Sequence, residues 1–148
     1  MSPTQQELAD AIKAMVQQWI ASGRAPSTYE INNGLCEDFA LEVISLFGDE
    51  SDRFAMYWAD NFSREGEGDD WDADLLEEHW PKCRPTHGLT WEDIRGEFPR
   101  HAWIVLDGRH YDAECPEGVE NLFELPLIRR GMEAFAAEKG VLAGAPAN

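Results

Sequence analysis

The sequence predicts an α+β domain in which helices pack on a small antiparallel sheet. The first observation is helical spacing of apolar side chains near the N-terminus, and the second is an Asp107-Gly108 pair between two strand-like runs. Asp-Gly is typical of two-residue hairpin turns, because both central residues need a positive φ. The third is that 148 residues with 43% hydrophobic side chains can bury one core. We therefore expect a single domain over residues 1–148.

Two amphipathic helices are predicted in the first third of the chain. Residues 3–22 form the first, and Gly23 suits the position after its last turn. Residues 24–30 are expected to be a loop. A turn at 32–34 precedes the second helix, which ends at Gly48. Apolar side chains at helical spacing are Leu8, Ala11, Ile12, Met15, Val16, Trp19 and Ile20 in the first helix and Phe39, Ala40, Val43, Ile44 and Phe47 in the second.

An acidic segment occupies residues 49–80. It carries twelve acidic side chains from Asp49 to Glu78 against two arginines. We expect a short helix around 51–62, a glycine-rich loop at 63–70 and a helix around 72–79. The segment is interpreted as a lid or as a recognition surface for a basic partner.

Shorter elements are predicted downstream of the acidic segment. Thr90-Trp-Glu-Asp resembles a capping box and predicts the start of a short helix. Beyond the hairpin, a turn is expected at 116–118 and a short edge strand at 122–127. The last predicted element is a helix over residues 130–139.

The Asp107-Gly108 turn fixes the register of the predicted hairpin. Leu106 faces Arg109, and the numbers of every facing pair sum to 215. His101 and Asp112 become diagonal neighbours within side-chain reach. Because alternate residues share a face, one face carries His101, Trp103, Val105, His110, Asp112 and Glu114.

The formal net charge of -17 limits the function classes. A nucleic-acid or membrane-surface protein needs a basic footprint, and none is visible. The acidity indicates a solvated surface or, alternatively, a basic substrate, a basic protein partner or a mimic of DNA. There is no apolar run long enough for a transmembrane helix and no signal-peptide pattern. With three cysteines, an odd number, we expect a soluble cytoplasmic protein with reduced thiols.

The strongest candidate site combines Cys36, His101 and Asp112. Cys36 lies in the first turn of the second predicted helix, where free N–H groups and the helix dipole favour a thiolate. His101 would hold the thiolate and carry the proton, and Asp112 would fix the imidazole tautomer. Around these three, Asn32, Asn33 and the Cys36 N–H are candidate oxyanion donors, Trp103 is a candidate shield of the His–Asp pair, and His110 is a candidate partner or competitor for Asp112.

Each residue also has a structural interpretation. A lone cysteine in an amphipathic helix is more often a small core residue, and a lone histidine at a strand start is usually structural. A zinc site is a weaker alternative to the Cys-His-Asp site, and the sequence offers a set of evenly spaced potential ligands for it. The set lacks CxxC and HExxH motifs and is interrupted by prolines, so we predict no metal and no cofactor. Its members are His79, Cys83 and His87, with Cys115 or His101 as possible further ligands.

The two blocks 34–40 and 101–112 resemble the transglutaminase-like branch of the papain-like cysteine hydrolase superfamily. Members carry Gly-x-Cys at a helix start, then a His-x-Trp strand, then an Asp on the next strand. The resemblance implies that Cys36, His101 and Asp112 are the catalytic residues and that an acyl-enzyme forms on the thiol. The acidic segment is not part of this family pattern.

The sequence thus predicts a cysteine hydrolase or acyltransferase acting on an amide or peptide substrate. A peptidase, an amidase and a deamidating enzyme all fit this chemistry. The alternative is a non-enzymatic binding protein on the same scaffold, whose acidic face binds a basic protein and whose triad is silent. The pattern leaves the oligomeric state open.

Overall fold

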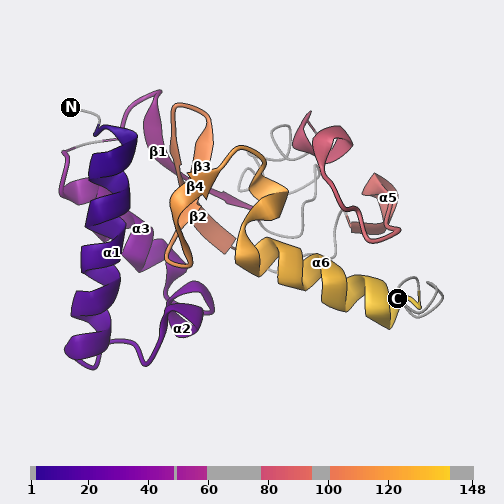
Figure 1. Cartoon of the computed structure of the whole chain (residues 1–148), viewed down its shortest axis with the longest axis horizontal. Coiled ribbons are helices and arrows are strands. Elements are labelled where there is room, and N and C mark those ends of the chain that lie inside the picture. The colour runs from indigo at the N-terminus through magenta and orange to yellow at the C-terminus, as the bar shows by residue number, and fades with distance from the viewer. Residues whose placement is uncertain (1–2, 49, 60–77, 95–100, 141–148) are drawn as a thin grey trace.

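The computed structural model describes residues 3–48, 50–59, 78–94 and 101–140 of the chain. Within these residues the fold is α+β, with helices on both sides of a four-stranded antiparallel sheet (Figure 1). The strands follow one another in the sheet in chain order, and their bounds are Phe54–Ala59 (β1), His101–Leu106 (β2), Arg109–Asp112 (β3) and Cys115–Val119 (β4).

The first helix, α1, spans Gln5–Ala21 and confirms the prediction for residues 3–22. Thr4 caps it: its Oγ1 accepts the Glu7 N–H at 3.0 Å, and the Glu7 carboxylate accepts the Thr4 N–H at 2.8 Å. After the last turn, Gly23 has φ 81°, a conformation in which glycine avoids a Cβ penalty.

The loop predicted at 24–30 is wrong in its second half. A short helix, α2, spans Thr28–Asn32, and the Ser27 Oγ at its N-cap accepts the Glu30 N–H at 3.3 Å. A serine cap therefore starts a helix that is too short to show periodicity. The next helix, α3, spans Cys36–Ser45 and confirms the second predicted helix.

The helix predicted around 51–62 is wrong, because the segment contains strand β1. It pairs with β2 along its whole length, from Phe54 opposite Leu106 to Ala59 opposite His101. Phe54 and Met56 contribute to the core on one face of the sheet, and Tyr57 packs against the core on the other, as alternation along a strand requires. Pairing and two-sided burial thus override the acidic surroundings that suggested a solvated helix.

Little of the acidic segment beyond β1 lies within the described residues. The predicted loop at 63–70 is outside them, as is all of the predicted helix at 72–79 except its last two residues, which are helical. A 3₁₀ turn, η1, follows at Trp80–Lys82. Helix α5 spans Trp91–Ile94, and Thr90 caps it as predicted: its Oγ1 accepts the Asp93 N–H at 3.3 Å.

The hairpin of β2 and β3 has the predicted turn and register. Asp107 and Gly108 have φ values of 51° and 81°, as a two-residue turn of this kind requires. The recorded facing pairs sum to 215, and they are Leu106 with Arg109, Val105 with His110 and Ile104 with Tyr111.

Two of the three predicted C-terminal elements differ from the structure, whereas the helix predicted at 130–139 is confirmed as part of a longer helix. The turn expected at 116–118 lies within β4, whose pairing with β3 is irregular between His110 and Asp112. The edge strand expected at 122–127 is wrong. A 3₁₀ turn, η2, spans Leu122–Glu124, and helix α6 spans Pro126–Glu138, with Pro126 at a helix start where its missing N–H costs nothing.

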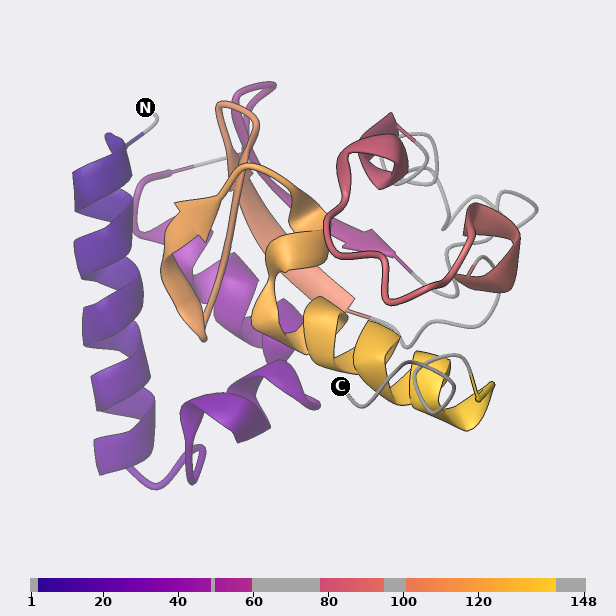
Figure 2. The same ribbon diagram turned by 45° about the vertical axis from the view of Figure 1, so that its right-hand side comes forward.

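The sheet has a hydrophobic core on each face. Helices α1 and α3 cover one face of the sheet, and α6 and η2 cover the other (Figure 1 and Figure 2). Burial of each large apolar side chain contributes about 1.5–3 kcal/mol. The largest fully buried side chains are Trp19, Trp103, Tyr111, Phe39 and Phe54.

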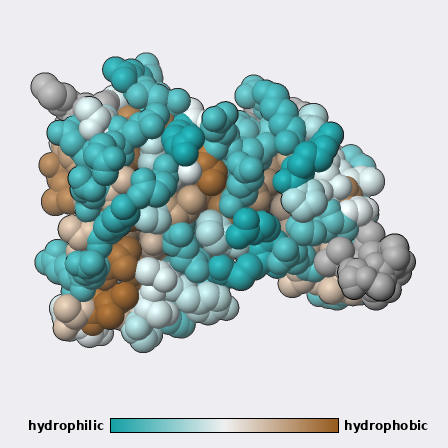
Figure 3. All heavy atoms as spheres, viewed as in Figure 1, coloured by the Kyte–Doolittle hydropathy of each residue, from teal (hydrophilic) through white to brown (hydrophobic). Residues whose placement is uncertain are grey.

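One face of the molecule carries mostly polar side chains. Figure 3 shows hydrophilic residues over most of this face, with smaller apolar areas between them. Among the residues that the structure describes, no helix is long and apolar enough to cross a membrane.

Candidate active site

Cys36 is the first residue of α3, at the point where that helix reaches the start of β2. Its Sγ accepts the backbone N–H of Ala102 at 3.4 Å. The residue before it, Leu35, is the N-cap and provides no side-chain hydrogen bond to the helix. The thiol therefore lies among backbone N–H groups at a helix N-terminus, which favour a negative charge.

His101 and Asp112 form a buried pair beside this helix start. They lie on adjacent strands, with 3.1 Å between His101 Nε2 and Asp112 Oδ2. Only 1% of His101 and 3% of Asp112 is exposed. An ionised carboxylate only accepts hydrogen bonds, so Nε2 is the donor. The predicted diagonal contact is therefore present.

The second ring nitrogen of His101, Nδ1, is not the one that contacts Asp112. Nδ1 is buried and has no hydrogen bond of good geometry among the described residues. The imidazole nevertheless interacts with the Cys36 thiol, and each group shifts the pKa of the other. Because Asp112 occupies Nε2, Nδ1 is the nitrogen left to take up the thiol proton.

The electrostatics favour an ion pair between Cys36 and His101. Burial opposes the thiolate, but the interaction with His101 and the N–H groups of Ala102 and Glu37 outweigh it and lower the pKa of Cys36. Burial would likewise lower the pKa of His101, but the hydrogen bond to Asp112 and the interaction with the Cys36 thiol raise it to about 9. Both shifts favour the charged forms at neutral pH.

The other two cysteines lie in the opposite electrostatic environment. Burial raises the pKa of Cys83 to about 11, and it does the same for Cys115. All three thiols are free. Only Cys36 therefore combines partial exposure with a lowered pKa, as a nucleophile requires.

Trp103 lies between the two histidines of the sheet. Its ring stacks on His101 with 6.0 Å between centroids and 20° between planes. Its Nε1–H donates to His110 Nδ1 at 3.0 Å. The predicted shielding of the His101–Asp112 pair by Trp103 stays a prediction.

His110 is hydrogen-bonded to Trp103 and not to Asp112, so its predicted role as partner or competitor for that carboxylate is wrong. The two oxygens of Asp112 accept from His101 Nε2 and from the Glu114 N–H, the latter at 2.9 Å. Burial and, to a smaller extent, the nearby His79 lower the pKa of His110 to about 3. His110 is therefore a neutral acceptor in the core.

The asparagines before Cys36 use their amides elsewhere. Asn32 Nδ2 donates to Glu114 Oε1 at 2.8 Å, and Asn33 Nδ2 donates to the Tyr29 carbonyl at 2.8 Å. A role for either amide in holding an oxyanion stays a prediction. The Cys36 N–H, at the start of α3, remains a candidate donor.

Two residues that the sequence did not single out as site residues join the network. Glu114 follows Asp112 by two residues, and its carboxylate receives two hydrogen bonds from the Arg130 guanidinium, at 2.8 and 3.1 Å. Arg130 projects from α6, and its guanidinium also lies 5.1 Å from the centre of the Tyr29 ring. The Asp-x-Glu spacing was visible in the sequence, but its partner depends on how α6 docks.

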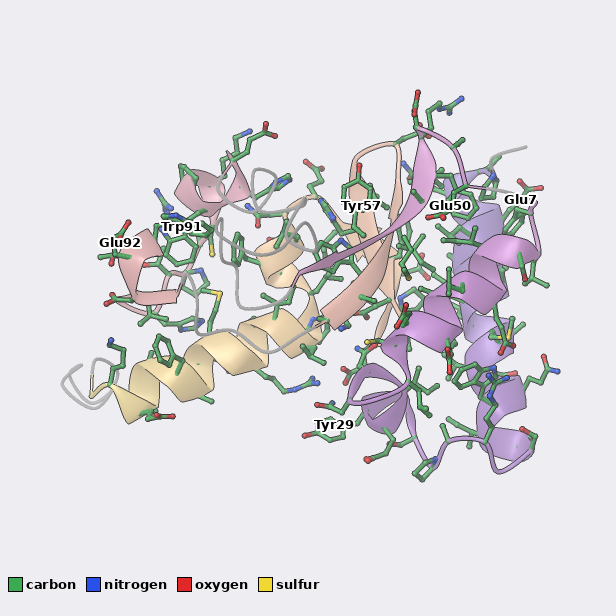
Figure 4. The ribbon with its side chains drawn as sticks, turned by 180° about the vertical axis from the view of Figure 1, so that it is seen from behind. Glu7, Tyr29, Glu50, Tyr57, Trp91 and Glu92 are labelled. Carbon is green, nitrogen blue, oxygen red and sulfur yellow. The ribbon has the colours of Figure 1, made fainter. Side chains whose placement is uncertain are left out.

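A pocket of about 420 Å³ adjoins the segment that leads into Cys36. Helix α2 and the turn after it form one wall, and α6 forms the other. Tyr29, labelled in Figure 4, lies on the α2 side and is 51% exposed. The lining residues are Tyr29, Asn32, Asn33, Gly34, Leu127, Arg130, Gly131 and Ala134.

The possible zinc ligands are not brought together. The His79 ring packs edge-on against His110 with 5.1 Å between centroids, whereas Cys83 Sγ donates to the Pro85 carbonyl at 3.5 Å. His87 Nε2 instead faces Glu133 at 3.8 Å. Within the described parts of the chain, no group of three potential ligands is placed to hold a metal ion.

Comparisons with known proteins add no relative. No protein-family model, no curated protein and no solved structure matches the chain significantly. The functional argument therefore depends on the geometry of the site itself.

Proposed function

We propose that this protein is a cysteine hydrolase or acyltransferase that acts on an amide or peptide bond, with Cys36, His101 and Asp112 as its catalytic residues. One observation carries the proposal. A helix start and two adjacent strands bring a thiol, an imidazole and a carboxylate together in the order that nucleophilic catalysis uses.

The reaction follows from the protonation states. The Cys36 thiolate attacks the carbonyl carbon of the amide, and the carbonyl π electrons move to oxygen. The C–N bond then breaks, and the imidazolium of His101 gives its Nδ1 proton to the departing amine. A thioester remains on Cys36. Neutral His101 next takes a proton from water or an acceptor amine as it attacks, and the thiolate leaves.

Asp112 and Trp103 support the imidazolium during these steps. Asp112 accepts from Nε2 and so keeps Nδ1 toward the thiol. Trp103 stacks on the same ring and keeps water from the pair. Because both groups are buried, their electrostatic effect is weakly screened.

We infer from the same residues that the chain is a transglutaminase-like member of the papain-like superfamily. The antiparallel sheet packed against the helix that carries Cys36 supports this assignment. Free thiols at all three cysteines support a reducing compartment, such as the cytoplasm.

The proposal is tested with p-nitrophenyl acetate, an activated ester that acylates a reactive thiol. The wild-type protein is expected to release a burst of nitrophenol, to carry acetyl on Cys36, and then to turn over. Cys36→Ser should lose both phases, whereas Cys83→Ser should retain them. The proposal would be overturned if Cys36 carried no acetyl, or no more acetyl than Cys83 and Cys115.

The alternative is a binding protein with a silent triad. The observation in its favour is that His101 and Asp112 are almost fully buried and that the 420 Å³ pocket is not lined by Cys36 itself. An unreactive Cys36 together with binding of a basic polypeptide, tested with polylysine, would favour this function.

A further inference from the structure

The carboxylate of Glu114 connects three parts of the fold that meet around the candidate active site. Its backbone belongs to the turn between β3 and β4, where Asp112 pairs with Cys115. Its side chain accepts hydrogen bonds from Asn32 of α2 and from Arg130 of α6. Only 14% of the Glu114 side chain is exposed.

The first connection fixes Asp112. One carboxylate oxygen of Asp112 holds His101, and the other accepts the Glu114 N–H at 2.9 Å. A carboxylate that accepts the N–H two residues ahead forms an Asx turn, which restricts its rotamer. The backbone position of Glu114 therefore determines where Asp112 directs the imidazole.

The second connection reaches the nucleophile. Asn32 is 2% exposed and donates its amide to Glu114 at 2.8 Å. It is the last residue of α2 and precedes Cys36 by only four positions. Glu114 thus links the segment that leads into Cys36 to the turn that follows Asp112.

The third connection holds the carboxylate itself. Arg130 donates through both terminal nitrogens, at 2.8 and 3.1 Å. A two-point guanidinium–carboxylate contact defines an orientation as well as a charge pairing. It also neutralises a carboxylate that would otherwise be poorly solvated near the site.

We propose that Glu114, held by Asn32 and Arg130, is a positioning residue that keeps the Cys36 segment aligned with the His101–Asp112 pair. Glu114 does not touch the reacting atoms. The proposal rests on the proposed function, because it assigns the network a role in keeping the thiol nucleophilic.

The test measures how fast iodoacetamide modifies Cys36 as a function of pH in the full-length protein, with mass spectrometry of the Cys36 peptide. Glu114→Gln is expected to raise the apparent pKa of the thiol by about half a unit to one unit. Alkylation at neutral pH should then slow by roughly three- to tenfold. Glu117→Gln is the matched control, because Glu117 lies in the same hairpin and pairs on the surface with Lys13. It should leave the profile unchanged.

The sign of the shift separates positioning from simple electrostatics. Loss of the Glu114 charge leaves Arg130 uncompensated, and a free cation would favour the thiolate and lower its pKa. Asn32→Ala removes the link to the Cys36 segment without a change in charge, and it should also raise the thiol pKa. This second variant decides the matter if Glu114→Gln fails to fold.

The proposal fails if wild-type Cys36 is selectively reactive but no variant that folds raises the pKa of the Cys36 thiol. The proposed function fails separately if wild-type Cys36 is alkylated no faster than Cys83 and Cys115.

Discussion

His101 and Asp112 meet across two neighbouring strands, with 3.1 Å between Nε2 and Oδ2, although both side chains are almost wholly buried. Two ionisable groups removed from water are costly unless each is paired and hydrogen-bonded. Here Asp112 also accepts the Glu114 N–H, and His101 lies beside the Cys36 thiol. The pair is therefore part of a connected polar network that reaches a nucleophile.

Asp112→Asn is expected to reduce turnover of an acyl substrate by roughly 10²- to 10⁴-fold. Asparagine cannot stabilise the imidazolium by charge, and it must present an NH₂ group to one of the two donors that Asp112 now accepts. The measurement is the steady-state rate with p-nitrophenyl acetate after thermal unfolding has shown that the variant folds. A rate within twofold of wild type would contradict the role of Asp112.

Activity should depend on pH as a bell-shaped curve. The acid limb follows Cys36, whose lowered pKa places it below that of an ordinary thiol, because the reactive thiolate is lost as the pH falls. The alkaline limb follows His101, whose proton for the leaving group is lost as the pH rises through about 9. The measurement is kcat/KM for an amide substrate across the pH range, because a departing amine needs the proton of His101. A rate that rises steadily through the alkaline range would contradict the ion pair.

His110 should make the fold sensitive to acid. Burial, and then His79, lower its folded-state pKa to about 3, well below the unfolded value of 6.5. Between these values the unfolded chain binds a proton that the folded chain does not, so the free energy of unfolding falls as the pH falls. The contribution of His110 from pH 7 to pH 5 is about 2 kcal/mol.

The matched variant for this prediction is His110→Gln, whose amide oxygen can accept the Trp103 Nε1–H. Urea unfolding of both proteins at neutral and mildly acidic pH isolates this residue from the other titrating groups. The variant should lose less stability on acidification than the wild type. Equal losses would show that His110 titrates normally.

Gly118→Ala should destabilise the fold by about 2–4 kcal/mol. Gly118 has φ 78°, and a Cβ there would lie 2.6 Å from Cε2 of the buried Tyr111. Gly23 is the control, because it has φ 81° and open space around the same position. Gly23→Ala should cost only about 1–2 kcal/mol, the cost of the backbone conformation alone. Similar losses in thermal unfolding of the two variants would contradict the close packing of β4 on Tyr111.

Local signals in the sequence predict the parts of the fold that depend on local chemistry. The Asp107-Gly108 turn fixes the strand register, and the position of Cys36 at a helix start follows from helical periodicity. Together they predict the contact between His101 and Asp112, since pairing places diagonal neighbours within reach. The approach of Cys36 to that pair required the docking of α3 on β2, which no local pattern contains.

The features that were missed depend on tertiary contacts. The β1 segment is acidic on both sides and becomes a strand only because β2 offers it a partner along its full length. His110 is a core acceptor because Trp103 lies next to it. The contact of Glu114 with Arg130 needs α6, which crosses the opposite face of the sheet from α3.

The most direct test of the account is the site-resolved pKa of the three thiols in the wild-type protein. Iodoacetamide alkylation is followed across pH, and the modification of each cysteine is quantified by peptide mass spectrometry. We expect Cys36 to react first and to titrate below an ordinary thiol, while Cys83 and Cys115 stay unreactive until strongly alkaline pH. A Cys36 that titrates with the other two, or that reacts only after the protein unfolds, would contradict the assignment of Cys36, His101 and Asp112 as a catalytic triad.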